Sequence, residues 1–401
     1  MSVTAAKGFT AAGTKGFTAA GIAAGIKENG NPDLALVVNN GPRLAAAGVF
    51  TSNRVKAAPV VWSEQVLKGG RVSAVILNSG GANACTGPLG FQDTHATAEK
   101  VAEALAGHSA GEVAVASTGL IGLRLPMDKL LPGVEQAAAE LTDHGGEKAA
   151  IAIKTTDSVH KTAQVSGGGT AGPEAGGGWT VGGMAKGAGM LAPGLATMLV
   201  VLTTDADVPA DALDTALRAA TRTTFDRVDS DGCMSTNDTV LLLASGASGI
   251  VPDQDDFAEA VRTVCADLAR QLIGDAEGAS KDIRIEVINA ASEDDAVEVG
   301  RSIARNNLLK CAIHGEDPNW GRVLSAIGTT SAVFEPDQLN VAINDVWVCK
   351  NGSVGEDRDL VDMRYREVRI TADLAAGKES AVIWANDLTA DYVHENSAYS
   401  S

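Results

Sequence analysis

The sequence predicts a mixed α/β fold, with a large domain followed by a smaller one. Short apolar runs typical of buried strands, such as Val72 to Leu77, alternate with stretches of helical periodicity, such as Asp255 to Gly274. The 401 residues exceed the length of a common single domain, and 45% of them are hydrophobic, which is enough for a sizeable core. Aromatic residues make up 4%, so we expect that core to be mainly aliphatic.

The charge and cysteine content of the chain disfavour several classes of protein. The 50 acidic and 32 basic residues give a net charge of -18, which argues against nucleic acid and anionic membranes as partners. The five cysteines are scattered and form no Cys-x-x-Cys pair, so we expect neither a disulfide framework nor a zinc site. The chain has no signal-peptide pattern and no apolar run of about 20 residues that could span a membrane. We therefore expect a cytoplasmic protein.

Strands that end in loops of small residues are predicted in the first third of the chain. Leu34 to Val38 and Ala45 to Thr51 flank a turn, Asn39-Asn40-Gly41-Pro42, that is typical of a hairpin. Val55 to Trp62 is predicted to be a further strand, followed by a short helix. Two later strands are expected to run into loops whose backbone N–H groups can face a ligand: Val72 to Leu77 before Asn78 to Gly87, and Glu112 to Ala116 before Ser117 to Gly122.

The remaining elements divide the chain near residue 280. Helices are predicted at Thr94 to Ala106, Met127 to Thr142, Glu147 to Ile153, Ala210 to Thr223, Asp255 to Gly274 and Glu293 to Asn306. Strands are predicted at Trp179 to Gly182, Thr239 to Ala244, Ile283 to Ala290 and Leu308 to Ile313. From this order we expect residues 1–280 to form the larger domain and residues 281–401 a smaller α+β domain.

The stretch that points most directly to chemistry runs from Gly182 to Leu202. Small residues and one lysine, Lys186, lead to the turn Pro193-Gly194, and Thr197 then stands at the head of the apolar run Met198 to Leu202. A hydroxyl is thereby placed at the start of a buried strand. The strand holds the residue on its C-terminal side, and the loop before it leaves the hydroxyl open to approach. This placement suits a nucleophile, although threonine is also common at an ordinary strand start.

Strain at the Ala196–Thr197 bond would give this hydroxyl a specific use. The hydroxyl of Thr197 attacks the carbonyl of Ala196, the acyl group moves from nitrogen to oxygen, and water hydrolyses the ester. The new chain begins with Thr197, whose α-amine has a reference pKa of about 7.7–8.0. That amine can act as general base for its own hydroxyl. From the loop alone, an ordinary threonine and a self-cleaving nucleophile both stay open.

Two further groups could serve the same chemistry. Thr118-Gly119 could form an oxyanion hole from a hydroxyl and a backbone N–H, or a plain β-turn. Lys186 could orient a substrate carboxylate or tune the Thr197 amine, or it could lie in solvent. Gly187 to Ala192 matches the G-x-G-x-x-A dinucleotide pattern, but no helix is expected to follow it, and the chain has no H-E-x-x-H motif. We therefore expect neither a nucleotide cofactor nor a metal.

Several motifs, taken in order, resemble one known family. The segment Gly183 to Leu199 reads Gly-Met-Ala-Lys-Gly-Ala-Gly-Met-Leu-Ala-Pro-x-x-Ala-Thr-Met-Leu. It is similar to the self-cleavage segment of the ornithine acetyltransferases, also called bifunctional glutamate N-acetyltransferases of arginine biosynthesis. The other motifs that fit the family extend over nearly the whole chain: Asn78 to Gly87, Ser117 to Gly122, Thr155-Thr156-Asp157, Ser235 to Thr239, Asp317 to Arg322 and Glu395-Asn396-Ser397.

The resemblance implies a fold and the roles of single residues. It implies an α/β/β/α sandwich of the self-cleaving aminopeptidase type, followed by a C-terminal α+β domain. Cleavage between Ala196 and Thr197 would give an α chain (1–196) and a β chain (197–401) that assemble as an α2β2 heterotetramer. Thr197 would carry the acetyl group, and Thr118 with Gly119 would form the oxyanion hole. The residues expected to contact the amino-acid substrates are Thr155, Lys186, Thr197, Glu277, Asn396 and Ser401.

The implied reaction is a ping-pong acetyl transfer. N2-acetyl-L-ornithine gives its acetyl group to the Thr197 hydroxyl, ornithine leaves, and L-glutamate takes the acetyl group. Both substrates carry an α-carboxylate, for which Lys186 is a natural counter-ion in an acidic protein. No cofactor is needed. The sequence does not decide whether acetyl-CoA is a second acetyl donor, and we expect recycling from N-acetylornithine to dominate.

Two other functions stay open at this point. A self-cleaving aminopeptidase or amidase on the same scaffold would use water as the acyl acceptor, but its usual nucleophile is serine. A non-catalytic binding protein with a decayed site is disfavoured, because Thr197, Lys186 and Thr118-Gly119 are all present. Loss of activity in Thr197→Ala would exclude it.

Overall fold

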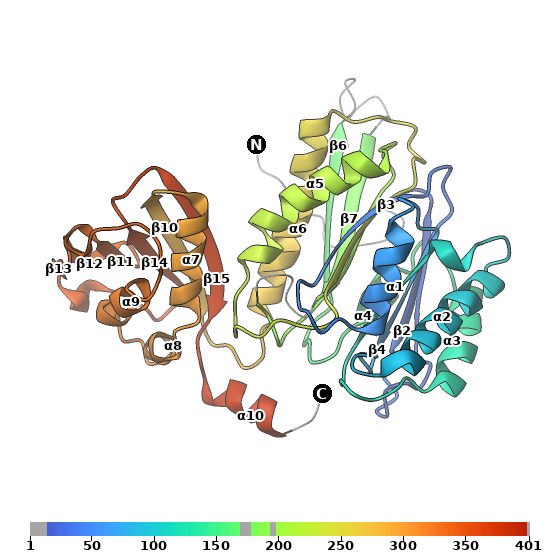
Figure 1. Ribbon diagram of the computed structural model, residues 1–401, viewed down its shortest axis with the longest axis horizontal. Helices are drawn as coiled ribbons and strands as arrows, with labels where there is room; N and C mark the ends of the chain where they lie inside the picture. Colours follow the sequence, from blue (N-terminus) through green and yellow to red (C-terminus); the bar gives the residue numbers. More distant parts are fainter. Residues whose placement is uncertain (1–13, 169–177, 193–197, 399–401) are drawn as a thin grey trace.

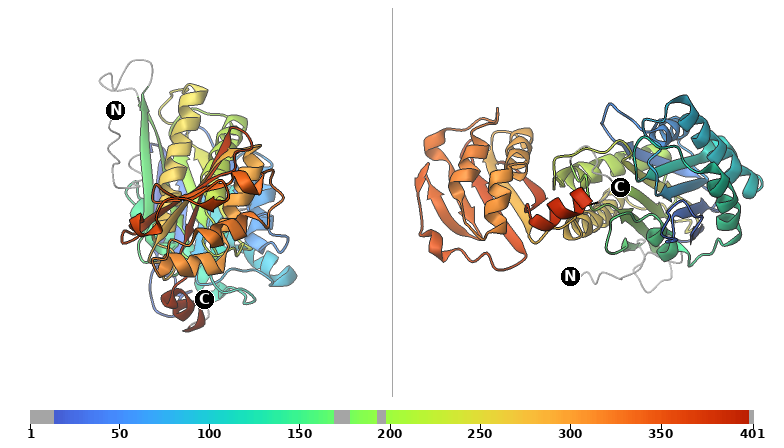
Figure 2. Two further views of the ribbon diagram at one scale, coloured as in Figure 1. Left: turned by 90° about the vertical axis from the view of Figure 1, so that its left-hand side faces the viewer. Right: turned by 90° about the horizontal axis from the view of Figure 1, so that it is seen from below.

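The computed structural model describes residues 14–168, 178–192 and 198–398. Within these residues the chain forms three β-sheets. Two of them lie face to face as a sandwich, and the third lies to one side of it (Figures 1 and 2).

The first sheet of the sandwich comes from the N-terminal part of the chain. Its strands, in spatial order, are β1 (Phe17–Ile22), β2 (Leu34–Asn39), β4 (Ala74–Ser79) and β5 (Val113–Thr118). β4 and β5 are parallel, with Ser79 beside Thr118, and the other neighbours are antiparallel. Its outer face is covered by α2 (Gly87–Ala104) and α3 (Met127–Ala139), and α1 (Ala58–Leu67) packs against β5.

The second sheet carries the strand that follows Thr197. Its strands, in spatial order, are β3 (Ala45–Phe50), β9 (Thr239–Ala244), β8 (Leu199–Thr204), β7 (Gly178–Lys186) and β6 (Lys161–Gly168). β8 and β9 are parallel, so both begin at the same end of the sheet. The outer face is covered by α5 (Ala210–Thr223) and α6 (Gln254–Gly274). Asp253 caps α6 by accepting the N–H groups of Asp255 and Asp256.

The inner faces of the two sheets share one core. Val37 and Leu77 of the first sheet belong to the same buried cluster as Val201 and Leu241 of the second, and α4 (Gly146–Ala152) adds its alanines to it. Because helices cover the outer faces as well, the central strands are buried on both sides and carry continuous apolar runs. The α/β/β/α sandwich that the resemblance implies is confirmed.

The third sheet is formed by the C-terminal part of the chain. Its strands, in spatial order, are β13 (Ser353–Val354), β12 (Val346–Lys350), β11 (Asn340–Ile343), β14 (Glu367–Asp373), β10 (Asp282–Ala290) and β15 (Glu379–Asn386). Its helices are α7 (Glu293–Ala304), α8 (Asn307–His314) and α9 (Trp320–Ile327). The last helix, α10 (Ala390–Ala398), lies below the junction of this unit with the sandwich (Figures 1 and 2). The division into domains 1–280 and 281–401 stays a prediction.

Two predicted strands are helical in the structure. Val55 to Trp62 contains the start of α1, and Leu308 to Ile313 lies inside α8. A short apolar run does not by itself distinguish a buried strand from a buried helix. Pro59 in the first turn of α1 and the cap on α8, where Asn306 Oδ1 accepts the N–H of Leu309, are the local features that favour helix.

The predicted hairpin around the Asn39-Asn40-Gly41-Pro42 turn is also wrong. β2 and β3 lie in different sheets, and the chain crosses between them after Asn39, whose Nδ2 donates to Ala244 O at 3.1 Å. β7 continues past the predicted end at Gly182, so Lys186 closes a strand instead of lying in a flexible approach. Glycine usually weakens a strand, but a Cβ at Gly183 would lie 2.4 Å from Leu202 Cδ2, so close packing explains it here.

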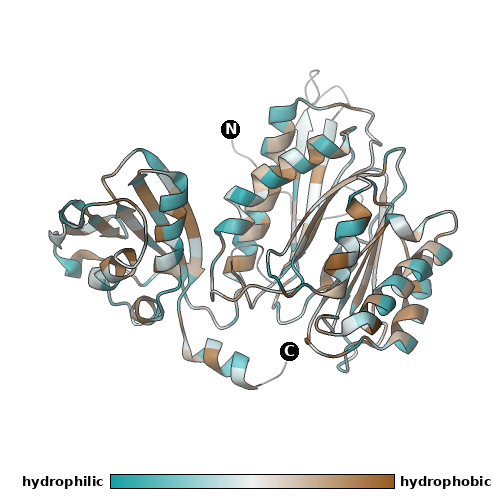
Figure 3. Ribbon diagram, viewed as in Figure 1, coloured by the Kyte–Doolittle hydropathy of each residue, from teal (hydrophilic) through white to brown (hydrophobic). Residues whose placement is uncertain are grey.

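The hydropathy of the helices and the state of the cysteines agree with what the composition predicts. Hydrophilic and hydrophobic residues alternate along the covering helices (Figure 3), a pattern typical of helices that pack one face on a sheet. Within the described ranges, no helix combines the length and apolar character needed to cross a membrane. All five cysteines lie in these ranges, and each is a free thiol.

Candidate active site

The candidate site lies where strand ends of the two sandwich sheets meet. β5 of the first sheet ends at Thr118, and β7 of the second ends at Lys186. Lys186 pairs with Leu199 at the start of β8. The lysine is therefore held directly beside the strand that Thr197 precedes in the sequence.

Lys186 and Thr118 are in direct contact. Lys186 Nζ donates a hydrogen bond of 3.2 Å to Thr118 Oγ1, and the two residues are only 1% and 2% exposed. Burial lowers the pKa of Lys186, and the nearby Asp157 carboxylate opposes that effect. The structure therefore excludes the alternative that the sequence left open, in which Lys186 lies in solvent.

Gly119 holds a backbone conformation that side chains rarely adopt. Its φ is +129°, and a Cβ there would lie 2.5 Å from Gly81 N and 2.7 Å from the carbonyl carbon of Gly80. Next to it, Ala82 N donates to Leu120 O at 3.0 Å. The backbone at Thr118-Gly119 is therefore fixed against the loop that follows β4, as a preorganised oxyanion hole requires.

A buried charge network lies on the other side of Lys186. Asp157 Oδ1 accepts hydrogen bonds from Lys161 Nζ and from Gly187 N, both at 2.7 Å. Lys161 Nζ also contacts Asp275 Oδ2 at 2.5 Å. Neither Lys161 nor the Asp157 side chain is exposed. This network anchors the backbone that directly follows Lys186.

The electrostatics of Asp157 fit its partners. Burial alone would raise the pKa of its carboxyl, but the Lys186 and Lys161 charges and the Gly187 N–H together hold that pKa below its usual range. Asp157 Oδ2 accepts the N–H of Thr155 at 3.0 Å. Thr155, a predicted substrate contact, is thereby tied to the same network as Lys186.

Glu277 and Asn396 meet although they are far apart in the sequence. Asn396 Nδ2, on α10, donates to Glu277 Oε2 at 3.0 Å. Glu277 N donates to Ala188 O at 3.0 Å, and a Cβ at Gly189 would lie 2.5 Å from the Glu277 carboxylate. The chain that continues from Lys186 therefore lies against Glu277.

Three of the predicted site residues, Ala196, Thr197 and Ser401, lie outside the described residues. The others, Thr155, Lys186, Thr118, Gly119, Glu277 and Asn396, are linked by the contacts above. Their catalytic and binding roles stay predictions. Within the described ranges, no group of three or more His, Cys, Asp or Glu side chains is arranged to hold a metal ion.

Some residues of this region were not among the predicted site residues. Asp157 is the third residue of the motif Thr155-Thr156-Asp157. Lys161 stands four residues after Asp157, a spacing typical of a helix, but Lys161 lies on strand β6. Asp275 pairs with Lys161 from 114 residues away, and no sequence spacing indicates such a pair. Asp157 lies between helix α4 and strand β6, and its place in the quoted motif Thr155-Thr156-Asp157 is the signal that could have found it.

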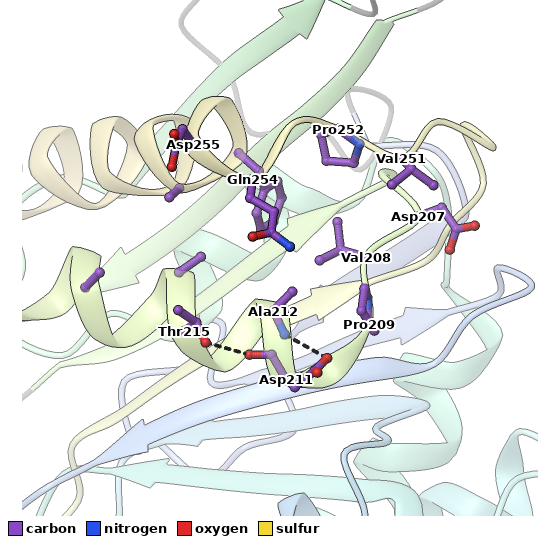
Figure 4. Close-up of a pocket in the computed structure, with 14 residues that line it drawn as sticks. Asp207, Val208, Pro209, Asp211, Ala212, Thr215, Val251, Pro252, Gln254 and Asp255 are labelled. Carbon is purple, nitrogen blue, oxygen red and sulfur yellow. Dashed lines mark hydrogen bonds between the residues drawn. The ribbon is translucent and has the colours of Figure 1, made fainter.

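A surface pocket lies elsewhere, between the N-terminal ends of α5 and α6 (Figure 4). Val208 and Val251 contribute apolar surface to it, and Asp211 and Asp255 contribute carboxyl groups. Among the described residues, its lining includes none of the predicted site residues. The pocket is therefore separate from the site at the strand ends.

Comparison with known proteins identifies the family of the chain. The model of the ArgJ family matches residues 18–401. The chain belongs to the ArgJ family. An ArgJ relative from Streptomyces avermitilis, called arginine biosynthesis bifunctional protein ArgJ, is 82% identical over 401 residues, with both chains fully covered. The ArgJ protein of Thermobifida fusca, under the same name, is 61% identical over 401 residues, again with full coverage of both.

A solved structure is also similar to this ArgJ chain. It is ornithine acetyltransferase from Mycobacterium tuberculosis, complexed with ornithine, with 56% sequence identity and a TM-score of 0.44. The match covers 49% of this chain and 99% of that chain.

Proposed function

We propose that this protein transfers the acetyl group of N2-acetyl-L-ornithine to L-glutamate in arginine biosynthesis. An acetyl-Thr197 ester is the intermediate, and cleavage between Ala196 and Thr197 first frees the α-amine of Thr197. Full-length identity of 82% to an arginine biosynthesis bifunctional protein supports the reaction class. The observation that carries the proposal is the buried hydrogen bond between Lys186 and Thr118, beside the fixed backbone of Gly119.

The residues have separate tasks in this reaction. The Thr197 hydroxyl attacks the acetyl carbonyl of the donor, while its own α-amine takes the hydroxyl proton. Thr118 Oγ1 and the N–H of Gly119 donate to the oxyanion of the tetrahedral intermediate. When that intermediate collapses, ornithine leaves with a proton on its amine. Glutamate then attacks the ester and restores the Thr197 hydroxyl.

The amino-acid substrates are small, so a few charged contacts suffice to orient them. The Lys186 ammonium is the counter-ion for the α-carboxylate that both substrates carry. Thr155, Glu277, Asn396 and Ser401 complete the contacts to the amino acid. The Thr155 N–H is already bound to Asp157, so the Thr155 hydroxyl is the group available to substrate.

The reaction uses no metal or nucleotide cofactor in this proposal, and acetyl-CoA acts as a second acetyl donor to glutamate. The word bifunctional in the relatives' names supports the second donor. We expect transfer from N-acetylornithine to be the faster of the two. The two cleaved chains stay together as an α2β2 heterotetramer. Five free thiols support the cytoplasm as its location.

An aminopeptidase on the same scaffold is not favoured, because the family match extends over residues 18–401 and far beyond the cleavage segment. The two functions differ in the acceptor. In the transferase, the acetyl-Thr197 ester reacts with the amine of an amino acid. In the hydrolase, water hydrolyses the acyl ester.

An exchange assay tests the proposal. Purified protein is mixed with N-acetylornithine and isotope-labelled ornithine, without glutamate. A ping-pong enzyme moves the label into N-acetylornithine, and Thr197→Ala abolishes that exchange. Release of acetate without exchange would instead support the hydrolase. Replacing N-acetylornithine by acetyl-CoA, with glutamate as acceptor, measures the second donor.

A further inference from the structure

We propose that residues 230–238 form a clamp that positions the Ala196–Thr197 bond for self-cleavage, with Asp238 as its principal positioning residue. The clamp connects η4 (Phe225–Arg227) to β9. It contacts the chain before and after that bond, at Leu191 and at Met198. The inference rests on the proposed function, since it concerns the step that frees Thr197.

On the upstream side the clamp holds the carbonyl of Leu191. The N–H groups of Ser230 and Asp231 both donate to Leu191 O, at 2.6 and 3.3 Å. Leu191 is fully buried. Lys310 Nζ, on α8, donates to Ser230 O, so the C-terminal unit supports this side of the clamp.

On the downstream side, Asp238 of the clamp and Thr239, the first residue of β9, hold both backbone groups of Met198. Asp238 Oδ1 accepts the Met198 N–H at 3.0 Å, and Thr239 N donates to Met198 O at 3.1 Å. Met198 is 1% exposed and Asp238 is fully buried. The residue that directly follows Thr197 is therefore fixed at its amide nitrogen and at its carbonyl.

The Asp238 carboxyl is fully buried, and only one of its oxygens accepts the Met198 N–H. Burial raises its pKa well above the usual range, against the opposing hydrogen bond of the Met198 N–H and the charge of Lys186. Within the described ranges, Asp238 Oδ2 is buried without a hydrogen-bond partner. Buried polar atoms of folded proteins are usually paired, and exceptions call for an explanation such as a functional site.

The neighbouring Asn237 ties the clamp to the candidate oxyanion hole. Its Nδ2 donates to Ser117 O at 2.8 Å and to Ala82 O at 2.6 Å. Ser117 directly precedes Thr118, and Ala82 follows the glycines against which Gly119 packs. Two consecutive residues, Asn237 and Asp238, therefore set the spacing between Met198 and the oxyanion hole.

The clamp is itself held rigidly by the end of β3 and the start of α1. Thr51 Oγ1 donates to Ser235 O at 2.7 Å, and Ala57 N donates to Thr236 O at 2.9 Å. Holding reacting groups in a near-attack geometry removes much of the entropic barrier, and a displacement of about 1 Å can slow a reaction about 100-fold. The clamp is therefore expected to act on the rate of cleavage.

The test follows conversion of newly made precursor into two chains during cell-free synthesis, by denaturing gel electrophoresis. Asp238→Ala removes the acceptor for Met198 N–H and is expected to slow cleavage about 100-fold. Asp238→Asn keeps a carbonyl acceptor and is neutral, so it is expected to recover cleavage to within about tenfold of wild type.

Asp205 provides the matched control. It is 2% exposed and its Oδ1 accepts the Thr180 N–H at 2.8 Å, but it follows the far end of β8. Asp205→Ala should lower the melting temperature by an amount similar to Asp238→Ala and should cleave at the wild-type rate. A slow Asp238→Ala beside a fast Asp205→Ala separates positioning from general loss of stability.

Several outcomes would overturn the clamp. Asp238→Ala cleaving at the wild-type rate, or Asp238→Asn as slow as Asp238→Ala, would each do so. If Asp238→Ala fails to fold, Lys310→Met provides the test, because it removes the ammonium that donates to Ser230 O. Cleavage of Lys310→Met at the wild-type rate would refute the clamp, and slower cleavage would support it. A wild-type chain that stays whole contradicts the proposed function, and the clamp with it.

Discussion

Lys186 Nζ donates a hydrogen bond to Thr118 Oγ1, from the end of a strand in one sandwich sheet to the end of a strand in the other. Sequence reasoning assigns these two residues to different tasks, the first to a substrate carboxylate and the second to an oxyanion. Because the two side chains are in contact, the group assigned to the carboxylate and the group assigned to the oxyanion lie in one small buried region. In this region a charge or a hydrogen-bond donor has a larger effect than it has in water.

The Lys186→Met variant should lose most of its acetyl transfer. The methionine keeps an unbranched side chain one atom shorter but removes the ammonium that binds the substrate carboxylate. A hydrogen bond to a charged group contributes about 1.5–3 kcal/mol, so kcat/KM should fall about 10- to 150-fold. Initial rates of N-acetylglutamate formation measure this, with the exposed Lys68→Met as control. An unchanged kcat/KM would remove Lys186 from the site.

The Thr118→Val variant should lower kcat far more than it changes KM. Valine has nearly the shape of threonine, so the strand end keeps its packing and loses only the hydroxyl. Removing one oxyanion donor reduces kcat about 100- to 1000-fold. Thr118→Ser retains the hydroxyl and should recover much of the activity. Equal activity of the valine and serine variants would contradict this role of the hydroxyl.

The Gly119→Ala variant should be strongly destabilised. Its φ of +129° disfavours alanine, and the added Cβ would lie 2.5 Å from Gly81 N. Gly122 offers a control, since its φ is +91° but no atom lies within 4 Å of a Cβ there. Strained backbone alone accounts for about 1–3 kcal/mol, so chemical denaturation should show a larger loss for Gly119→Ala. Equal losses would mean that the clash is relieved by movement of the glycine loop.

The free energy of unfolding should depend on pH through Asp229. Its side chain is buried, and its Oδ2 accepts a hydrogen bond of 2.8 Å from Arg305 Nε. Burial raises the pKa of Asp229 to about 6, against the opposing charge of Arg305. A carboxyl with a raised pKa binds its proton more tightly in the folded state, so its contribution to stability falls as pH rises from about 4 to about 6.

The comparison with Asp229→Asn isolates this contribution. Relative to the variant, the wild-type free energy of unfolding should fall by up to about 3 kcal/mol between pH 4 and pH 6. Urea denaturation at a series of pH values measures the difference. A difference that stays constant over this range would show that Asp229 keeps the same charge throughout.

The two-sheet core was largely predictable from the sequence. Val72 to Leu77 and Thr239 to Ala244 are apolar at nearly every position, because strands covered on both faces need no polar side. The path of the chain between strands was not predictable. Whether β2 pairs with β3 depends on contacts with β1, β4 and β9, and the turn between them carries no information on those contacts.

The candidate site also has a part that the sequence predicts and a part that it does not. Thr118, Gly119 and Lys186 stand beside glycine-rich stretches that are visible in the sequence. The groups that support them were less visible. Lys161 and Asp275 form a buried ion pair across 114 residues, and only the fold brings them together. Asp238 lies in the quoted motif Ser235 to Thr239, but its contact with Met198 depends on the parallel pairing of β8 and β9.

The central claim is that Thr197 becomes the first residue of a new chain and carries the acetyl group. An intact-mass spectrum of the denatured protein, with and without N-acetylornithine, tests it most directly. We expect two chains, 1–196 and 197–401, with one acetyl group added to the second in the presence of the donor. A single uncleaved chain that never gains an acetyl group would contradict the claim.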